Sequence, residues 1–153
     1  MPSDDRDESH DEKLDRNWDD LLQELRVTQT GIQLLSGFML TLPFTQVFPS
    51  LDHGQKALYL GLVLLAGVSL GVNLTPIMLH RRLFGDHVKE RVVAVGQVLS
   101  QVVIVAIGLL LTGTVTLIFS VVESWTAGFV AGACIAVVLV ALLGVVPRLL
   151  EPS

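Results

Sequence analysis

The feature that most limits how this chain can fold is a set of four long runs without an acidic or basic charge. They occupy residues 27–51, 57–80, 92–122 and 124–147. A helix needs about 20 residues to cross the ~30 Å hydrocarbon core of a bilayer, so each run is long enough for one crossing. The runs lack the two-residue alternation of barrel strands, and lipid admits only helices and closed barrels. The sequence therefore predicts four transmembrane helices, at approximately residues 28–49, 57–79, 92–114 and 125–147.

Composition agrees with a lipid environment. Hydrophobic residues make up 51% of only 153 residues, more than the interior of so short a soluble domain can hide. Of the 15 acidic residues, 10 lie between Asp4 and Glu24, so the net charge of −5 describes a tail and gives no footprint for nucleic acid. The single cysteine, Cys134, excludes an intramolecular disulfide and a multi-cysteine metal site.

The first residues differ in character from the rest of the chain. Residues 1–16 are almost entirely polar and charged, and we expect them to form a disordered acidic tail. Beyond them Asn17 is suited to cap a helix, and apolar residues recur at helical spacing: Trp18, Leu21, Leu22 and Leu25. We predict an amphipathic extension of the first helix that lies at the membrane surface, with Trp18 among the lipid headgroups.

Basic residues set the expected orientation. Nine of them lie in the tail, at the start of the first helix, in the loop 81–91 and after the last run, whereas only Lys56 lies on the opposite side. An excess of Lys and Arg marks the cytoplasmic side of a membrane. We therefore expect an all-α protein of the plasma (inner) membrane, a four-helix bundle over residues 17–150 with a cytoplasmic amphipathic extension and both termini in the cytoplasm.

Two short patterns carry a resemblance. Residues 17–33 read NWxxLLxELRVxQTGxQ, and residues 76–84 read PxxxHRxxF. Over residues 17–148 the chain resembles an uncharacterised family of small bacterial four-span membrane proteins, which sometimes carry a sodium/proton antiporter label. The resemblance implies a four-helix inner-membrane protein and no established activity. The residues argue against the label, because none of the four spans has an interior Asp, Glu, His or Lys to relay protons.

Amides stand inside the first and third spans where ionisable groups are missing. They form two pairs at four-residue spacing, with a threonine further along each stripe: Gln29, Gln33 and Thr41, and Gln97, Gln101 and Thr112. In one interpretation the two stripes face each other and tie the helices together, at ~0.6–2 kcal/mol per hydrogen bond. In the other they line a polar path or a small-molecule site open to the cytoplasm.

Small residues and a proline mark the second and fourth spans. Gly67 and Gly71, and likewise Gly128 and Gly132, form faces that let helix backbones approach closely. Two uses stay open for these faces: packing inside one bundle, or a contact between subunits. Pro76 removes a backbone donor and can kink the second helix.

Charged residues are expected to gather at the cytoplasmic ends of the first three spans: Glu24, Arg26, His80, Arg81, Arg82 and Arg91. One interpretation is a basic collar that touches anionic headgroups. In the other, Glu24 pairs with an arginine, His80 adds pH sensitivity and an acidic partner docks there.

The sequence contains no nucleophile with a paired base, no metal-ligand spacing and no glycine-rich phosphate loop, so we expect neither an enzyme nor a cofactor. Two functions remain. The first is a non-enzymatic membrane protein: an accessory subunit, scaffold or homo-oligomer whose partners are the bilayer and another membrane protein or a second copy. The alternative is a small ion or solute transporter or channel with a Gln/Thr-lined path.

Overall fold

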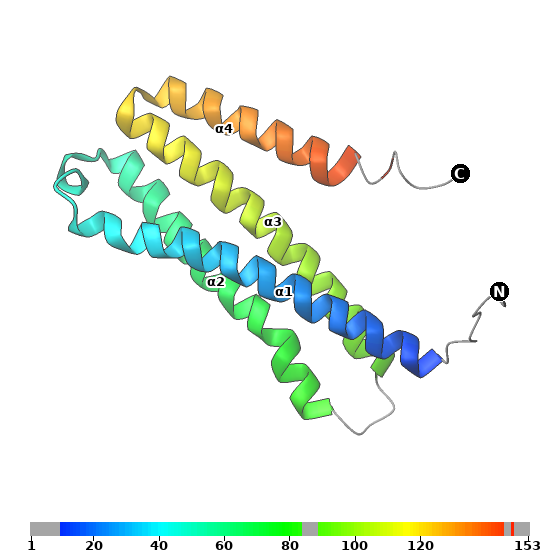
Figure 1. Cartoon of the computed structure of the whole chain (residues 1–153). Coiled ribbons are helices and arrows are strands. Elements are labelled where there is room, and N and C mark those ends of the chain that lie inside the picture. Colours follow the sequence, from blue (N-terminus) through cyan, green and yellow to red (C-terminus); the bar gives the residue numbers. More distant parts are fainter. Residues whose placement is uncertain (1–9, 84–88, 146–147, 149–153) are drawn as a thin grey trace, which may run out of the picture.

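The structure, a computed structural model, describes residues 10–83, 89–145 and residue 148. Within these ranges the chain forms four long helices without any strand, which confirms the all-α prediction. The helices are α1 (His10–Thr41), α2 (His53–Leu83), α3 (Lys89–Val122) and α4 (Trp125–Val140) (Figure 1). Short helical turns complete the fold: two 3₁₀ turns, η1 (Leu42–Phe44) and η2 (Phe48–Ser50), and a π turn, η3 (Ala141–Val145).

The bounds of α1 differ from the prediction at both ends. The helix begins at His10 rather than Asn17, because residues 10–16 contain no Gly or Pro to interrupt it. Residues 1–9 of the expected tail lie outside the described residues. The helix ends at Thr41 rather than near residue 49, since Pro43 lacks an N–H and its ring clashes with the carbonyl four residues earlier.

The chain leaves α1 through η1 and η2, each of which contains a proline. Phe48 of η2 rests edge-on against Tyr59 of α2, with the ring centroids 5.2 Å apart. This apolar stretch after Thr41 is therefore two tight turns against the start of α2 rather than the last turns of a straight helix.

Among the described residues, three helical segments are long and apolar enough to cross a membrane: His53–Pro76, Ala94–Val122 and Trp125–Val145. The helix that contains the third predicted span does not end near residue 114: α3 continues unbroken through Gly113 to Val122, and the point where it leaves the membrane stays a prediction. α1 is not among the helices that are long and apolar enough to cross a membrane. Its first half is charged and its apolar half stops at Thr41, so no stretch of about 20 apolar residues forms within it.

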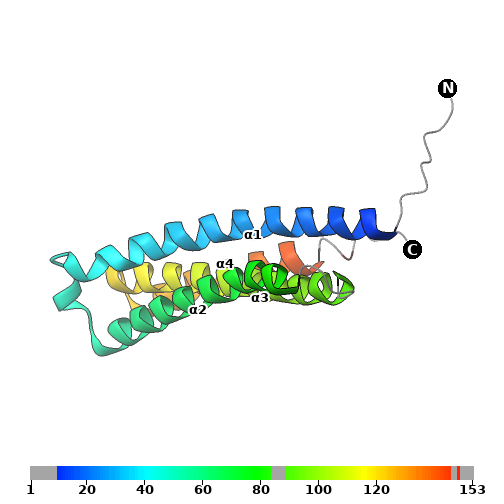
Figure 2. The same ribbon diagram turned by 90° about the horizontal axis from the view of Figure 1, so that it is seen from below.

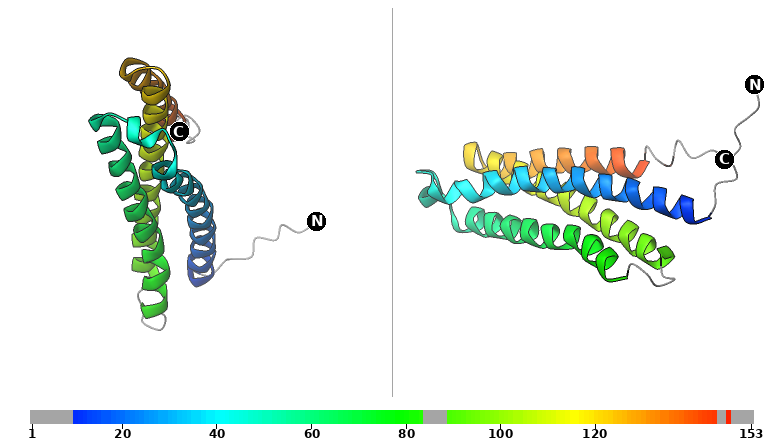
Figure 3. Two further views of the ribbon diagram at one scale, coloured as in Figure 1. Left: turned by 90° about the vertical axis from the view of Figure 1, so that its left-hand side faces the viewer. Right: turned by 60° about the horizontal axis from the view of Figure 1, so that its bottom comes forward.

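The four helices do not close into a symmetric bundle. α1 and α3 run in one direction and α2 and α4 in the other (Figure 1). α1, α2 and α3 pack against one another, whereas α4 packs along α3 and reaches the start of α2 through its first residue, Trp125 (Figures 2 and 3). The apolar segment of α3 is 33% buried inside the protein, compared with 11% for the apolar segment of α4. The expected four-helix bundle is thus a three-helix core with α4 attached to one side.

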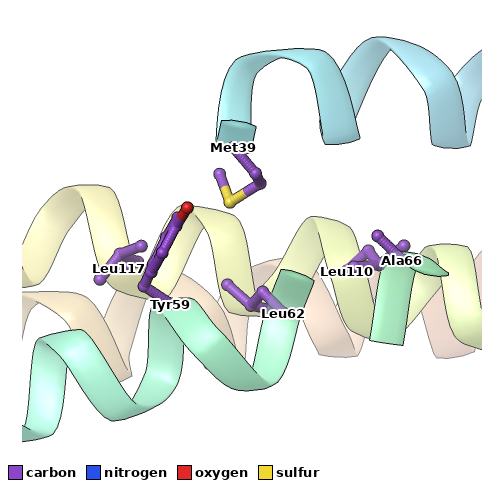
Figure 4. Close-up of a cluster of buried hydrophobic side chains, with 6 residues drawn as sticks. All are labelled: Met39, Tyr59, Leu62, Ala66, Leu110 and Leu117. Carbon is purple, nitrogen blue, oxygen red and sulfur yellow. The ribbon is translucent and has the colours of Figure 1, made fainter. Parts of the chain in front are cut away.

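The interior of the three-helix core is mainly apolar at mid-length. Its buried polar exception on α3 is Thr114, between Leu110 and Leu117, whose hydroxyl forms no hydrogen bond with the described residues. The buried apolar side chains form one cluster: Met39, Tyr59, Leu62, Ala66, Leu110 and Leu117 (Figure 4). Gly113 allows this packing, since a Cβ at that position would collide with the Leu62 side chain of α2. We call this cluster the apolar layer.

The amphipathic part of α1 also belongs to the core. Trp18, Leu21 and Leu25 are buried, and Leu21 lies so close to Gly96 of α3 that a Cβ there would stand 3.0 Å from the Leu21 side chain. The segment therefore buries its apolar face against protein, and its predicted place at the membrane surface with Trp18 among headgroups stays a prediction. Its apolar face is covered by α3, alongside which α1 forms one uninterrupted helix from His10 to Thr41.

Candidate functional site

The first polar site joins α1 to α2 and α3 on one side of the apolar layer. Asn73 of α2 is only 1% exposed, and its amide donates to the Leu25 carbonyl oxygen at 3.2 Å and to Thr28 Oγ1 at 3.0 Å. The Ser100 hydroxyl of α3 donates to Glu24 Oε2 at 3.3 Å. We call these residues, Glu24, Thr28, Asn73 and Ser100, the Asn73 cluster.

The hydrogen bonds of the Asn73 cluster are incomplete. Asn73 Oδ1 is buried and accepts no hydrogen bond from the part of the chain that the structure describes. Leaving a buried acceptor unpaired costs on the order of 1–3 kcal/mol, which offsets much of what its two donated bonds contribute. Glu24, in contrast, is exposed, so its carboxylate can be solvated from outside the protein. The cluster fastens three helices without satisfying every polar atom.

The second polar site lies at the other end of the core, where α2 begins. Asp52 and Gln55 form a capping box: the Gln55 N–H donates to Asp52 Oδ1 at 2.8 Å, and the Asp52 N–H donates to Gln55 Oε1 at 3.0 Å. The Gln55 amide nitrogen also donates to the Ser120 carbonyl oxygen of α3 at 2.9 Å. The start of α2 is thereby fastened to the end of α3.

Trp125, the first residue of α4, completes this site. Its indole N–H donates to Asp52 Oδ2 at 2.8 Å, and Gly54 leaves room for the ring, since a Cβ there would lie 2.9 Å from Trp125 Cζ2. The backbone N–H of Gln55 and the indole of Trp125 lower the pKa of Asp52 below its ordinary value of 3.8. We call Asp52, Gln55, Ser120 and Trp125 the Gln55 cluster; it joins three helix ends.

The structure does not bring the two predicted amide pairs together. Gln33, Gln97 and Gln101 are exposed, Gln29 is half-buried, and none of them forms a hydrogen bond with another described residue. Thr41 is exposed and donates to the Phe38 carbonyl of its own helix, and Thr112 is half-buried. The interpretation that the two stripes tie α1 to α3 is therefore wrong for this chain.

The register of the helices explains this separation. α1 and α3 run in the same direction, and the Ser100 bond places Glu24 level with residue 100. Gln33 follows Glu24 by about 14 Å at 1.5 Å per residue, whereas Gln101 directly follows Ser100. The two pairs are thus offset along the helices by about two turns.

The two glycine faces have different surroundings. Gly128 and Gly132 of α4 are buried against α3: a Cβ on Gly128 would lie 2.6 Å from the Thr116 carbonyl oxygen, and one on Gly132 would collide with Thr116 Oγ1. This face packs inside the chain. Gly67 and Gly71 of α2 are exposed, and a Cβ on either would meet nothing within 4 Å. The two faces therefore do not pack against each other.

The predicted charged cluster is described only in part. Glu24 and Arg26 are exposed on α1. Helical backbone places His80, Arg81 and Arg82 in the last turns of α2 and Arg91 in the first turn of α3, but their side chains lie outside the described part of the structure. Pairing of Glu24 with an arginine stays a prediction. Among the described residues, no three His, Cys, Asp or Glu side chains are placed to hold a metal ion.

The profile of a family of unknown function (DUF6328) matches residues 7–147. The chain belongs to this family. The DUF6328 match spans all four long helices and both polar clusters, and agrees with the expected resemblance to an uncharacterised family. No curated protein and no solved structure matches the chain.

Proposed function

We propose that this chain is a non-enzymatic, multi-pass protein of the inner (plasma) membrane that works by assembly, as a scaffold or accessory subunit. Three membrane-length helices in a family of unknown function are consistent with such a role. Its partners are the lipid bilayer and other membrane-embedded helices, and it carries no cofactor.

The proposal includes four crossings. The apolar half of α1, residues 27–41, is about 22 Å long at 1.5 Å per residue, and η1 and η2 extend it toward the start of α2. It packs beside α2 and α3, which are long enough to span a bilayer. The bias of Arg and Lys supports a cytoplasmic position for both termini and for the α2–α3 connection.

The apolar layer is the observation that favours assembly over transport as the function. It lies between the Asn73 cluster and the Gln55 cluster and fills the core at mid-length with side chains such as Leu110, 1% exposed, and Leu117, 2% exposed (Figure 4). A path for ions or polar solutes needs oxygen or charged groups along its length. The side-chain amides of the Asn73 and Gln55 clusters on either side of the layer bond helix to helix instead.

Two measurements on the full chain test this proposal. The protein is purified from native membranes in a gentle detergent, the mass of the surviving complex is measured, and the same protein in liposomes is tested for proton and sodium flux. We expect a complex that exceeds the 16.6 kDa of one chain, and flux equal to that of empty liposomes. A lone chain that conducts ions would contradict the proposal.

A further inference from the structure

The outward face of α1 carries an unusual set of residues for a helix in lipid. Thr30, Gln33, Gly37 and Thr41 follow one another at spacings of three or four, so they share one side of the helix, and all four are exposed. We call this side the Gln33 face. Leu34 and Phe38, which are 64% and 67% exposed, flank it.

Only one residue of the Gln33 face lacks the hydrogen bonds it needs. The Thr30 and Thr41 hydroxyls donate to carbonyl oxygens of α1 itself, at 3.0 and 2.8 Å. The Gln33 amide forms no hydrogen bond with any described residue. In water such an exposed amide needs no partner, but in hydrocarbon its donors and its acceptor have none.

The alignment of α1 with α3 puts Gln33 level with the apolar part of the α3 span. It stands about 14 Å beyond Glu24 along α1, level with Leu109 of α3, which is 57% exposed on the apolar span. Gln97 and Gln101 lie in the first eight residues of the segment Ala94–Val122, level with Leu21 and Leu25 and beside the charged Glu24. This segment has 29 residues, more than the about 20 that one crossing needs, so its first residues lie nearest the headgroups and water. Among the exposed amides of the described helices, Gln33 is therefore the one that lipid leaves unsatisfied.

We infer that the Gln33 face binds the same face of a second copy of this chain, an inference that rests on the membrane insertion proposed above. A primary amide is both donor and acceptor, so two Gln33 side chains can form reciprocal hydrogen bonds. Copies inserted with the same orientation are related by a two-fold axis along the membrane normal, which sets two α1 helices side by side and parallel.

The rest of the Gln33 face suits this contact. Gly37 lies one turn beyond Gln33, and the space around its α-carbon is open, so the backbone of a second α1 can approach there. The exposed Gly67 and Gly71 of α2 also leave space, but that face has no unsatisfied side chain that calls for a partner. It therefore provides the matched control for the experiment.

Cysteine cross-linking of the full chain in native membranes tests the inference. In a Cys134→Ser background, Gln33→Cys and Gly37→Cys are compared with Gly67→Cys and Gly71→Cys after mild oxidation. We expect disulfide-linked dimers from the two α1 positions and monomers from the two α2 positions. Monomers from all four positions, dimers from α2 instead, or cross-links from α1 to a different protein would each overturn the inference.

The amide itself is tested by the dissociation constant of the dimer in liposomes, measured by energy transfer between labelled copies. Gln33→Leu removes both reciprocal hydrogen bonds, since both copies carry it, and is expected to raise the constant about 10- to 900-fold, at 3- to 30-fold for each interhelical hydrogen bond. Gln33→Asn, which keeps an amide, should restore association, and Gln101→Leu should leave it unchanged. An unchanged constant in Gln33→Leu would overturn the role of the amide.

These outcomes separate the inference from the proposed function. Recovery of the chain in the soluble fraction would overturn both. A membrane-embedded chain that yields no dimer through α1 would overturn the inference and leave a membrane protein that assembles through another surface.

Discussion

The two polar clusters occupy opposite ends of the same three-helix core, yet their buried amides differ in how completely they are hydrogen-bonded. In the Gln55 cluster the amide is used at both ends, with Oε1 accepting from Asp52 and the nitrogen donating to Ser120. In the Asn73 cluster the amide donates twice while its oxygen stays unpaired. Both amides are buried, so burial alone does not indicate how much each one stabilises the fold.

The difference follows from where each amide sits. Gln55 lies in the first turn of α2, where free backbone N–H groups and a neighbouring loop supply partners. Asn73 lies inside α2, where the backbone N–H groups are already used within the helix. Its possible partners are therefore side chains and carbonyl oxygens of a neighbouring helix, such as Thr28 Oγ1 and the Leu25 carbonyl oxygen. We therefore expect the Gln55 cluster to fix the fold and the Asn73 cluster to contribute little net stability.

The largest effect is expected in the apolar layer that separates the clusters. Leu110→Ala removes a side chain that is 1% exposed and should reduce the free energy of unfolding by about 2–4 kcal/mol through lost packing. Leu109→Ala, next to it but 57% exposed, is the control and should change the value by less than about 0.5 kcal/mol. Detergent-induced unfolding followed by circular dichroism measures both. Equal effects would mean that the layer is not a packed interior.

Breaking the Gln55 cluster comes next. Gln55→Leu removes the return bond of the capping box and the bond to Ser120, and we expect a loss of about 1–2 kcal/mol in the same unfolding measurement. Gln101→Leu replaces an exposed amide that has no hydrogen bond among the described residues and serves as the control. A Gln55→Leu protein as stable as wild type would remove the contrast between the clusters.

The matching substitution in the other cluster should have a smaller effect. Asn73→Leu removes two donated bonds but also the unpaired buried oxygen, so the free energy of unfolding should stay within about 0.5 kcal/mol of wild type. A loss as large as that of Gln55→Leu would show that Asn73 Oδ1 has a partner that completes the cluster.

The smallest effect concerns pH. Asp52 has a folded pKa below its ordinary 3.8, so its contribution to stability is complete above the unfolded pKa and is lost as pH falls through the folded value. Asp52→Asn cannot lose this contribution. The difference in thermal midpoint between wild type and Asp52→Asn should therefore be constant near neutral pH and change only at acidic pH. A change between pH 6 and 8 would point to a different group.

The sequence was sufficient for the all-α fold and for three membrane-length helices, because length and charge-free runs determine both. It did not reveal that α1 stops at Thr41, although Pro43 carries that information. The Asp52–Gln55 capping box was also readable from its spacing. Its partners Ser120 and Trp125 were not, since they come from distant helix ends that only packing brings together.

Whether the predicted site residues meet depends on how far the helices are displaced along one another. The spacing of Gln29 and Gln33, and of Gln97 and Gln101, correctly identifies helix faces, but spacing within one helix carries no information about how far a second helix is displaced along it. The Glu24–Ser100 contact sets that displacement and moves the two pairs apart. For the same reason the glycines of α4 and α2, alike in sequence, have different surroundings: one pair contacts Thr116 and the other faces outward.

Thiol accessibility decides whether the chain crosses a membrane with a sealed interior at the apolar layer. In a Cys134→Ser background, Leu110→Cys and Glu123→Cys are exposed in intact vesicles to a membrane-impermeant thiol reagent from each side in turn. We expect Glu123→Cys to react from the outer side and Leu110→Cys to react from neither. Rapid labelling of Leu110→Cys would mean that water reaches the apolar layer, and the chain would then be better explained as a conduit than as an assembly unit.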